Sequence, residues 1–442
     1  MVLDNCSHVA VIGGGPAGSF FGFFLLEMAQ RVGLDLQVDV YEPRDFSLPG
    51  PTGCNMCGGI IYETLVQALA AEGINLPPTV VERGIDSYVL HMNEGRVRIQ
   101  TPLREKRIAA VHRGAGPRGI KELKWRSFDG YLLDLAAGKG ARLVRGRVDD
   151  VNWQDGRPQV KIQGGLPRAY DLLAVAAGVN TSALKIFENR EVAYAPPQTT
   201  RTYIGEFYLG QETVERCLGS SMHVFLLNIP RLEFAALIPK GDYVTLCLLG
   251  REIDGPLVQS FLNAREVRQC LPHDWRVPED HCHCSPRINV RGALRPFADR
   301  IVFIGDCGVS RLYKDGIGCA YRAAKAAAVT AIFEGISAED FRRHYWRVCQ
   351  AVEEDNKIGK VVFAIIRLIQ KTRSARRGLL RMVVREQQKE GERQDMSMVL
   401  WDTFTGSAMY REIFLRGLHP SFLGRFVWNT VVGVWPALRG RA

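Results

Sequence analysis

The stretch Val9-Ala-Val-Ile-Gly13-Gly-Gly15-Pro-Ala-Gly18 decides the fold of the first part of this chain. Residues 8–12 are an apolar run that predicts a short buried strand, and residues 19–32 predict a helix. A second apolar strand is expected over residues 36–41. Strand, glycine-rich turn, helix and strand in this order predict a βαβ unit with two parallel strands.

The glycines of this turn have separate tasks. Gly13 makes the tight turn from strand to helix, Gly15 lets the backbone approach a pyrophosphate, and Gly18 allows close packing of helix on strand. Pro16 and Ala17 belong to the same turn and are assigned to the cofactor site, and the N–H groups and positive dipole at the start of the following helix attract phosphate groups. The turn therefore predicts a dinucleotide site.

An acid at the end of the second strand extends this prediction. Glu42 is placed to accept hydrogen bonds from the ribose hydroxyls of an adenosine, with Arg44 beside it. A carboxylate there disfavours a 2′-phosphate, so FAD or NAD(H) fits better than NADPH. We also assign Val148 and Gly178 to the cofactor site. Residues 171–178 predict a buried strand that passes the ribose, although an ordinary core strand explains this segment equally well.

A second segment, Arg300-Ile-Val-Phe-Ile-Gly305-Asp306, favours FAD. An apolar strand that ends in Gly-Asp places a carboxylate at its C-terminal edge, where Asp306 can hold the ribityl hydroxyls of a flavin. The helix that follows is expected to direct its N-terminus at the pyrimidine edge of the flavin, where the helix dipole stabilises the anionic reduced form. The expected contacts in this helix are Gly316, Ile317 and Gly318.

Length and composition set the frame for these motifs. The chain has 442 residues, 46% of them hydrophobic, which predicts two domains and an appendage. Its eleven cysteines are scattered, which favours a reducing, cytoplasmic setting. The uncharged run over residues 8–26 contains Gly-Gly-Gly-Pro-Ala-Gly, which would break a membrane-spanning helix. We therefore expect a soluble protein, or one bound to one leaflet.

Together these segments resemble the FAD flavoproteins of p-hydroxybenzoate hydroxylase fold and, within them, the geranylgeranyl reductase family. Four further segments carry the resemblance: Cys54-Asn-Met-Cys57-Gly58-Gly59-Ile60, Arg126-Ser-Phe128-Asp129-Gly-Tyr-Leu132, Phe234-Ala-Ala-Leu-Ile-Pro239-Lys-Gly241-Asp242, and Tyr313-Lys-Asp-Gly316-Ile-Gly318-Cys-Ala-Tyr-Arg-Ala-Ala-Lys325. It extends from the N-terminus to about Glu334. The chain departs from the family in three places. Cys54 is an additional cysteine, Cys307-Gly308-Val309 stands where Ala-Ala-Gly is usual, and the loop that follows is unusually basic because of Arg311 and Lys314.

The resemblance implies a mixed α/β architecture. We expect a discontinuous Rossmann-like FAD domain (residues 1–79, 106–185 and 287–345), an inserted antiparallel-sheet substrate domain (residues 80–105 and 186–286) and a basic helical C-terminal region (residues 346–442).

The resemblance also implies a chemistry, in which the reduced flavin transfers hydride to a carbon–carbon double bond of a prenyl-type lipid. An isolated alkene accepts hydride poorly, so an acid and a dry apolar tunnel are needed. The family's Cys-Gly-Gly loop lies beside the isoalloxazine, which makes Cys57, Gly58 and Gly59 the catalytic candidates. Cys57 would position the substrate or supply the proton, and a water relay explains the proton equally well. The family's motif arginine, Arg126 here, contacts the cofactor.

Two other functions remain open from the sequence. One is a monooxygenase of the same fold acting on an aromatic substrate, and the other is an electron-transferring flavoprotein that docks to a protein partner. The sequence has no second dinucleotide fingerprint, so the reductant is a transient NADPH or a ferredoxin-like donor.

Two cysteine-containing segments are candidates for redox or metal chemistry. Cys54-x-x-Cys57 is a candidate dithiol or half of a metal site, and residues 281–284 (His-Cys-His-Cys) are a candidate second half. Neither segment has a second CxxC at zinc spacing. We therefore expect no metal site.

The segment Lys357–Lys389 contains ten Lys or Arg residues and one acid, Glu386. At helical spacing one face carries Val362, Ile365, Ile366 and Ile369, and the opposite face carries Lys360, Arg367 and Lys371. This pattern is typical of a helix in an anionic membrane interface. A helix packed on the protein with a solvated basic face is the alternative. No nucleic-acid recognition motif accompanies the charge.

Overall fold

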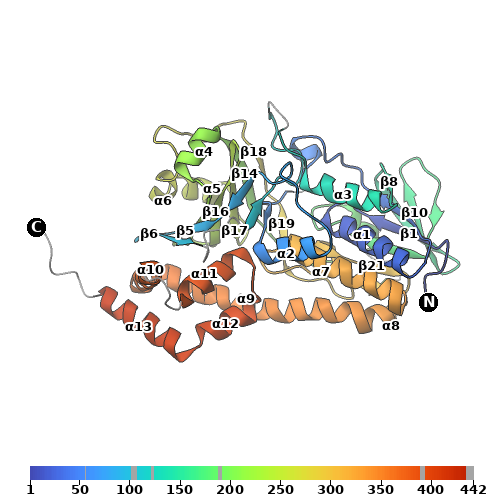
Figure 1. Cartoon of the computed structure of the whole chain (residues 1–442). Helices are drawn as coiled ribbons and strands as arrows, with labels where there is room; N and C mark the ends of the chain where they lie inside the picture. The colour runs from blue at the N-terminus through green and yellow to red at the C-terminus, as the bar shows by residue number, and fades with distance from the viewer. Residues whose placement is uncertain (55, 101–106, 121–123, 188–191, 389–393, 435–442) are drawn as a thin grey trace, which may run out of the picture. The chain divides into compact units, whose positions relative to one another are not determined.

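The computed structural model describes residues 1–54, 56–100, 107–120, 124–187, 192–388 and 394–434. The chain divides into two compact units, each built from three separate segments (Figure 1). The first unit comprises Met1–Cys57, His112–Thr200 and Pro286–Asn356, and the second comprises Gly58–Val111, Arg201–Ser285 and the chain from Lys357 onward. The domain boundary expected at residues 105 and 106, and Lys389 at the end of the basic segment, lie outside the described residues.

A six-stranded sheet forms the centre of the first unit. Its strand order is β20 (Phe297–Ala298), β21 (Ile301–Phe303), β12 (Leu172–Val175), β1 (His8–Ile12), β2 (Gln37–Tyr41) and β8 (Arg142–Val144). All neighbours are parallel except β20 and β21. The chain order reverses between β1 and β12, and in doubly wound sheets ligands bind at such a switch point, outside the carboxyl ends of the strands.

Both faces of this sheet are covered. Helix α1 (Pro16–Arg31) packs against α3 (Phe128–Gly138) and α7 (Gly316–Val329). On the other face, Val151 and Val160 from the meander β9 (Val148–Gln154), β10 (Arg157–Ile162) and β11 (Arg168–Ala169) share a core with Ala10 of β1. Burial on two sides explains why the central strands β1, β12 and β21 are nearly continuous apolar runs. The remaining elements of this unit are η1 (Gly50–Thr52), η2 (Ala183–Phe187), β13 (Gln198–Arg201), β19 (Arg287–Arg291), η3 (Gly305–Cys307), η4 (Thr330–Glu334), α8 (Ala338–Asp340), η5 (Phe341–Tyr345) and the start of α9 (Trp346–Lys371).

The second unit is built on a seven-stranded sheet. Its order is β18 (Cys282–Cys284), β14 (Tyr203–Tyr208), β17 (Tyr243–Gly250), β16 (Leu232–Lys240), β15 (Ser221–Phe225), β5 (Ser87–Met92) and β6 (Gly95–Gln100). Neighbours are antiparallel except β5 and β15, which are parallel. A small sheet of β3 (Ile60–Ile61), β7 (Ile108–Ala110) and β4 (Arg83–Ile85) belongs to the same unit, together with α2 (Glu63–Ala71).

Two helical layers cover the seven-stranded sheet. On one face Leu237 of β16 shares a core with Phe261 of α5; this layer consists of α4 (Gln211–Cys217), α5 (Gly255–Leu262) and α6 (Arg265–Arg268). On the other face Phe234 of β16 contacts Phe363 and Phe404, at ring-centroid distances of 6.1 and 5.6 Å. That layer consists of α9, α10 (Arg373–Gln388), α11 (Asp395–Thr405), α12 (Tyr410–Gly417) and α13 (Pro420–Val434). Phe234 and Leu237 are three residues apart on β16, so their side chains point to opposite faces of the sheet. This explains why each of them contacts a different helical layer.

The predicted fold class, a Rossmann-like sheet with an antiparallel-sheet part and a helical C-terminal region, is confirmed. The strand predicted over residues 8–12 has these bounds in the structure, and the strand predicted over residues 36–41 covers Gln37–Tyr41. The helix predicted over residues 19–32 begins earlier, at Pro16, and ends at Arg31. The helix expected after Asp306 begins at Gly316, where the Asp315 carboxylate caps it. Within the described ranges, no helix combines the length and hydrophobicity that a membrane crossing requires.

Candidate functional site

The loops after β1, β12 and β21 meet at the carboxyl edge of the parallel sheet. Gly13 has φ +105°, and a Cβ atom there would lie 2.5 Å from the carbonyl oxygen of Ala176. A Cβ atom on Gly18 would lie 1.8 Å from the carbonyl oxygen of Gly13, and one on Gly305 would lie 2.6 Å from the Cβ of Ala17. These three positions therefore admit glycine only.

The start of α1 is open to an anion. Gly15 is the N-cap residue, so no side chain caps the helix, and its first turn contains no acid. The nearby hydroxyl of Ser19 donates to the carbonyl oxygen of Gly14 at 2.8 Å. The N–H groups at the helix start thus lack a side-chain acceptor within the described residues. This arrangement fits a phosphate or pyrophosphate group.

Glu42 lies directly beside the glycine turn. Its side chain is 1% exposed, and its two oxygens accept hydrogen bonds from the backbone N–H groups of Gly14 and Arg44, each at 2.9 Å. The Arg44 guanidinium donates to the carbonyl oxygen of Cys54 at 3.2 Å. The Arg44 Nε also donates to Oε1 at 3.3 Å. The oxygen bonded to Gly14 therefore has capacity for a further hydrogen bond, which fits a ribose hydroxyl.

Asp306 follows β21 in the short helix η3 and lies at the first turn of α7. Its Oδ1 is 3.8 Å from the position that a Cβ on Gly316 would take. Asp315 caps α7 by accepting from the Gly318 N–H at 3.1 Å, although it has φ +59°. Asn289 donates to the Asp306 carbonyl oxygen at 2.8 Å, and its buried Oδ1 has no hydrogen-bond partner in the described part of the chain. Such an orphaned acceptor fits a ligand hydroxyl.

The other predicted cofactor residues are distributed as follows. Gly178 has φ +71° and open space where a Cβ would be, at the end of the segment that Gly13 contacts. Ile317 and Gly318 are buried in the first turn of α7. Val148 lies in the core between the parallel sheet and the meander. The Arg126 side chain is 48% exposed and pairs with Asp134.

Arg113 is a site residue that sequence reasoning missed. Its side chain is 10% exposed, pairs with the fully buried Asp129, and donates a hydrogen bond to the Cys57 side chain. Burial opposes the guanidinium charge, but Asp129 and Cys57 raise the pKa of Arg113 above its ordinary value. The glycine-rich segment 112–119 was the available signal, since a Cβ on Gly114 would lie 2.4 Å from the Gly53 carbonyl oxygen.

In the second unit, Gly58 and Gly59 lead to a buried polar cluster. A Cβ on Gly58 would lie 2.8 Å from the Cys247 sulfur, and one on Gly59 would lie 1.9 Å from the Val111 carbonyl oxygen and 3.1 Å from the Lys240 Nζ. Lys240 is 1% exposed, and its Nζ lies 3.8 Å from a Glu206 carboxylate oxygen. The Glu206 carboxylate also accepts from the Thr245 hydroxyl at 2.8 Å.

Glu82 belongs to the same cluster. It is 8% exposed, and neither carboxylate oxygen has a hydrogen-bond partner in the described residues. Burial raises the pKa of Glu82 to about 8; Lys240 counteracts this rise, while Glu206 and Asp242 add to it. A carboxyl with this pKa is mostly protonated at neutral pH. No local pattern in the sequence indicates its burial, which depends on tertiary packing.

The cysteine and basic segments singled out in the sequence have ordinary surroundings. Cys54, Cys57, Cys282 and Cys284 form no disulfide with one another or with any other described cysteine. In the described residues, none of them joins a cluster of three metal-ligating side chains. In the basic loop, Arg311 is buried and faces Asp315 and Asp355 at 3.7 and 3.9 Å.

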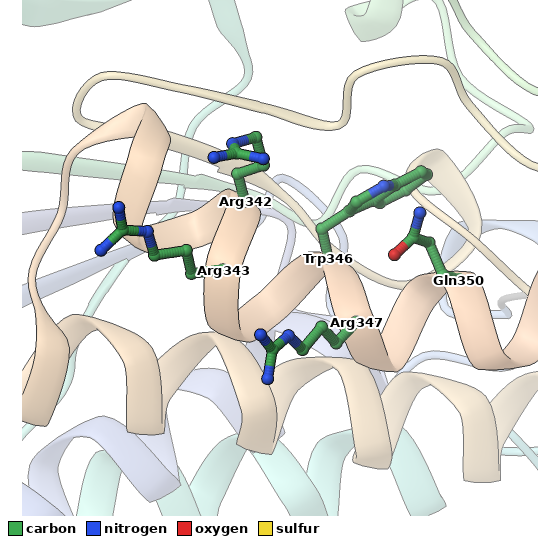
Figure 2. Close-up of a pocket in the computed structure, with 5 residues that line it drawn as sticks. All are labelled: Arg342, Arg343, Trp346, Arg347 and Gln350. Atoms are coloured by element: carbon green, nitrogen blue, oxygen red, sulfur yellow. The ribbon is translucent and has the colours of Figure 1, made fainter.

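An open hollow of about 470 Å³ lies on the first unit, along η5 and the start of α9. Arg342, Arg343, Trp346, Arg347 and Gln350 line it. Figure 2 shows Arg342, Trp346 and Gln350 extending from one side of the helix, while Arg347 points away from them. Arg342 and Arg343 both pair with Glu339, so part of the positive charge at this hollow is already neutralised.

Sequence searches find no matching family model and no matching curated protein. Solved structures match the fold across almost the whole chain. A geranylgeranyl bacteriochlorophyll reductase-like protein from Thermoplasma acidophilum has TM-score 0.64 and 12% identity, covering 97% of this chain and 100% of that chain. A single-residue mutant of the halogenase PltM, in complex with FAD, has TM-score 0.60 and 13% identity, covering 97% and 91%.

A third match is the p-nitrophenol 4-monooxygenase PnpA from Pseudomonas putida, with TM-score 0.57 and 11% identity, covering 91% of this chain and 98% of that chain. All three identities are low, so the similarity concerns the fold. This chain therefore has the fold that the reductase-like protein, the halogenase and the monooxygenase share.

Proposed function

We propose that this chain is an FAD-dependent oxidoreductase that reduces carbon–carbon double bonds of a prenyl-type or other apolar lipid. One observation carries the cofactor assignment. An uncapped helix start, a buried carboxylate at Glu42 and a second carboxylate at Asp306 follow strands of one parallel sheet, at its carboxyl edge. These groups match the pyrophosphate, adenosine ribose and ribityl chain of FAD. The FAD complex of a structure with this fold supports the same assignment.

The residues divide the remaining work. Bound FAD in its reduced form supplies the hydride. Glu82 holds a proton at neutral pH, so it is suited to supply the proton that an alkene carbon needs. Lys240 and Glu206 set the charge around Glu82. The Arg113 guanidinium fixes the Cys57 side chain, which gives Cys57 a positioning role in this proposal.

The C-terminal helices support contact with an anionic membrane surface. On α13 the side chains of Leu423, Val427, Trp428 and Val431 recur at helical spacing and are 41–63% exposed. On α9 the exposed apolar residues are Val361, Ile365 and Leu368, whereas Val362 and Ile366 of the predicted apolar face are buried in the second unit. Apolar side chains with tryptophan beside basic residues are typical of interfacial helices. We place the protein in the cytoplasm, at the inner face of the membrane.

Part of the basic segment has an internal role. Arg367, predicted on the solvated face, pairs with Glu233 at 2.6 Å. Arg376 is buried and pairs with Glu94. The exposed bases left for a lipid surface include Lys357, Lys360 and Lys371.

The reductant in this proposal is NADPH or a ferredoxin-like protein. The hollow of Figure 2 offers either donor a contact with Arg347, and with Arg342 and Arg343 if the acidic groups of the donor displace Glu339.

The test is anaerobic turnover of the purified flavoprotein, reduced chemically, with an isoprenoid lipid extract. Mass spectrometry of the products should show lipids that gain pairs of hydrogen atoms. Oxygen-dependent turnover of an aromatic compound would instead establish a monooxygenase. Reoxidation by a partner protein, with no lipid product, would establish an electron-transfer protein.

A further inference from the structure

Three side chains far apart in the sequence meet under the α4–α6 layer of the second unit. His91 lies on β5 and His223 on the parallel neighbour β15, where His223 pairs with Val89 and His91 pairs with Phe225. Both imidazoles therefore lie on the same face of the sheet. Cys270 follows α6 and packs in the core that covers this face. The three residues are 2%, 4% and 2% exposed.

Their donor atoms form a compact triangle. The His91 Nε2 lies 3.1 Å from the His223 Nδ1. The Cys270 sulfur lies 3.4 Å from the His223 Nδ1 and 3.6 Å from the His91 Nε2. Around tetrahedral zinc, with bonds of about 2.0–2.1 Å to nitrogen and about 2.3 Å to sulfur, two nitrogens lie about 3.3 Å apart and nitrogen and sulfur about 3.5 Å apart. The triangle thus has the size that zinc requires.

We propose that His91, His223 and Cys270 form a zinc site, with a water molecule as the fourth ligand. His223, but neither His91 nor Cys270, also lines a surface hollow of about 430 Å³ together with Arg96 and Cys217, and in this proposal the ion and its water enter from that side. A zinc ion there ties the segment after α6 to β5 and β15. Three protein ligands and one exchangeable position are typical of open zinc sites.

The protonation states suit two of the ligands directly. Burial lowers the pKa of His91 to about 4 and that of His223 to about 3, so both imidazoles are neutral and offer lone pairs. Burial raises the pKa of the Cys270 thiol to about 12. Zinc binding therefore forms a Zn–S bond as the thiol proton leaves to solvent, and the net charge added to the site falls from two to one.

Nearby positive charges oppose the binding of a zinc cation at this site. The guanidinium groups of Arg96 and Arg98 act on His223, and Arg96 also acts on His91 and Cys270. Both arginines are exposed, so solvent and salt screen their repulsion of a cation. The alternative is a hydrogen-bonded cluster without metal, since N–H···N and S–H···N contacts have similar lengths.

The site lacks a sequence signature. Residues 91 and 223 are separated by 132 positions, and 223 and 270 by 47. The sequence-based expectation of no metal site rested on the spacing of cysteines and histidines within short segments. A site assembled from two strands and a residue after a helix has no such spacing.

The experiment measures bound zinc in the full-length flavoprotein after incubation with zinc chloride and removal of unbound metal. Wild type should retain one zinc ion per chain by mass spectrometry of metals, and Cys270→Ser should lose it. Cys284→Ser is the matched control, since it alters the His281–Cys284 run, and it should retain zinc. Zinc should also raise the Tm of wild type and not that of Cys270→Ser.

Two results would overturn the proposal: wild type that retains no zinc, or Cys270→Ser that retains as much as wild type. Equal FAD content and circular dichroism spectra check that Cys270→Ser is folded. If it is not folded, His223→Gln replaces it. Cobalt(II) titration of wild type gives an independent readout, because a thiolate ligand produces an intense charge-transfer band; its absence would count against Cys270 as a ligand.

Discussion

At the scale of single residues, glycines and carboxylates of the first unit carry the cofactor assignment. Gly13 and Gly18 could be assigned from the sequence because their roles are local: a turn and a close approach within ten residues. Glu42 was predictable because it ends the next strand of the same βαβ unit. The pairing of Arg113 with Asp129 was not predictable from the sequence, and neither were the surroundings of Glu82. Both depend on packing between segments that are separate in the sequence.

Glu42→Gln should weaken FAD binding about tenfold or more. The amide keeps the shape but loses a charge-assisted acceptor, and a hydrogen bond to a charged group contributes about 1.5–3 kcal/mol. Flavin fluorescence during titration of the apoprotein measures the affinity. The exposed Glu354, in the same unit, provides the control: Glu354→Gln should bind FAD as wild type does. Equal affinity of both variants would remove Glu42 from the site.

Glu82→Gln should flatten the pH dependence of stability. The folded-state pKa of Glu82, about 8, lies above the ordinary value of 4.5, so its protonated form stabilises the protein below pH 4.5. That contribution is lost as pH rises through about 8. Between about pH 5 and about pH 9, the Tm of wild type should therefore fall more steeply with rising pH than the Tm of Glu82→Gln.

The same variant tests the acid role. Lipid reduction by Glu82→Gln should drop by about 10²-fold or more, a typical contribution of general acid catalysis. Glu212→Gln, at an exposed position on α4, should keep both the wild-type pH profile and the wild-type rate. Parallel Tm profiles for wild type and Glu82→Gln would show that this carboxyl does not titrate in the expected range.

At the scale of elements, the helix α9 shows where periodicity alone is insufficient. Helical spacing predicts one apolar face of Val362, Ile365, Ile366 and Ile369. In the structure Ile366 is 8% exposed and Ile365 is 45% exposed, because the buried stripe of this helix follows Val362, Phe363 and Ile366. Spacing predicts that a helix is amphipathic, but the neighbouring layer decides which residues of a broad stripe are covered.

These two adjacent isoleucines form a matched pair for measuring packing. Ile366→Ala should lower the free energy of unfolding by about 2–4 kcal/mol, because it removes buried methyl groups and leaves a cavity. Ile365→Ala should cost less than about 1 kcal/mol. Denaturant unfolding followed by circular dichroism compares them. Equal losses would mean that α9 is not packed through Ile366.

At the scale of the whole molecule, the fold was more predictable than the substrate. Alternating strands and helices with glycine-rich turns predicted a Rossmann-like sheet, since these signals are local. The chain's net charge of +10 is also readable from the sequence. The sequence does not show which of these charges are exposed. In the structure Arg367, Arg376 and Arg311 face carboxylates inside the protein, while other basic residues are exposed.

Binding to vesicles of anionic phospholipid should therefore depend on both charge and apolar contact. Co-sedimentation should decrease as salt rises, since ions screen exposed charges within about 8–10 Å. Trp428→Glu should reduce binding severalfold, because it places a charge among the exposed apolar residues of α13. Tyr208→Glu, with a similarly exposed aromatic on β14, should bind as wild type does. Equal binding of all three proteins would exclude α13 from the membrane surface.

The division of each unit into three chain segments has a consequence for biosynthesis. As the chain leaves the ribosome, the β1–β2 pair emerges early, but strand β21 of the same unit begins about 260 residues after the end of β2, and helix α7 follows it. This interval lasts on the order of thirteen seconds or more at typical elongation rates. The seven-stranded sheet is likewise synthesised before the C-terminal helices that cover one of its faces. Apolar strand faces are exposed during that interval, so newly made chains should depend on chaperones, and production in the host should be limited by this delay rather than by the final stability.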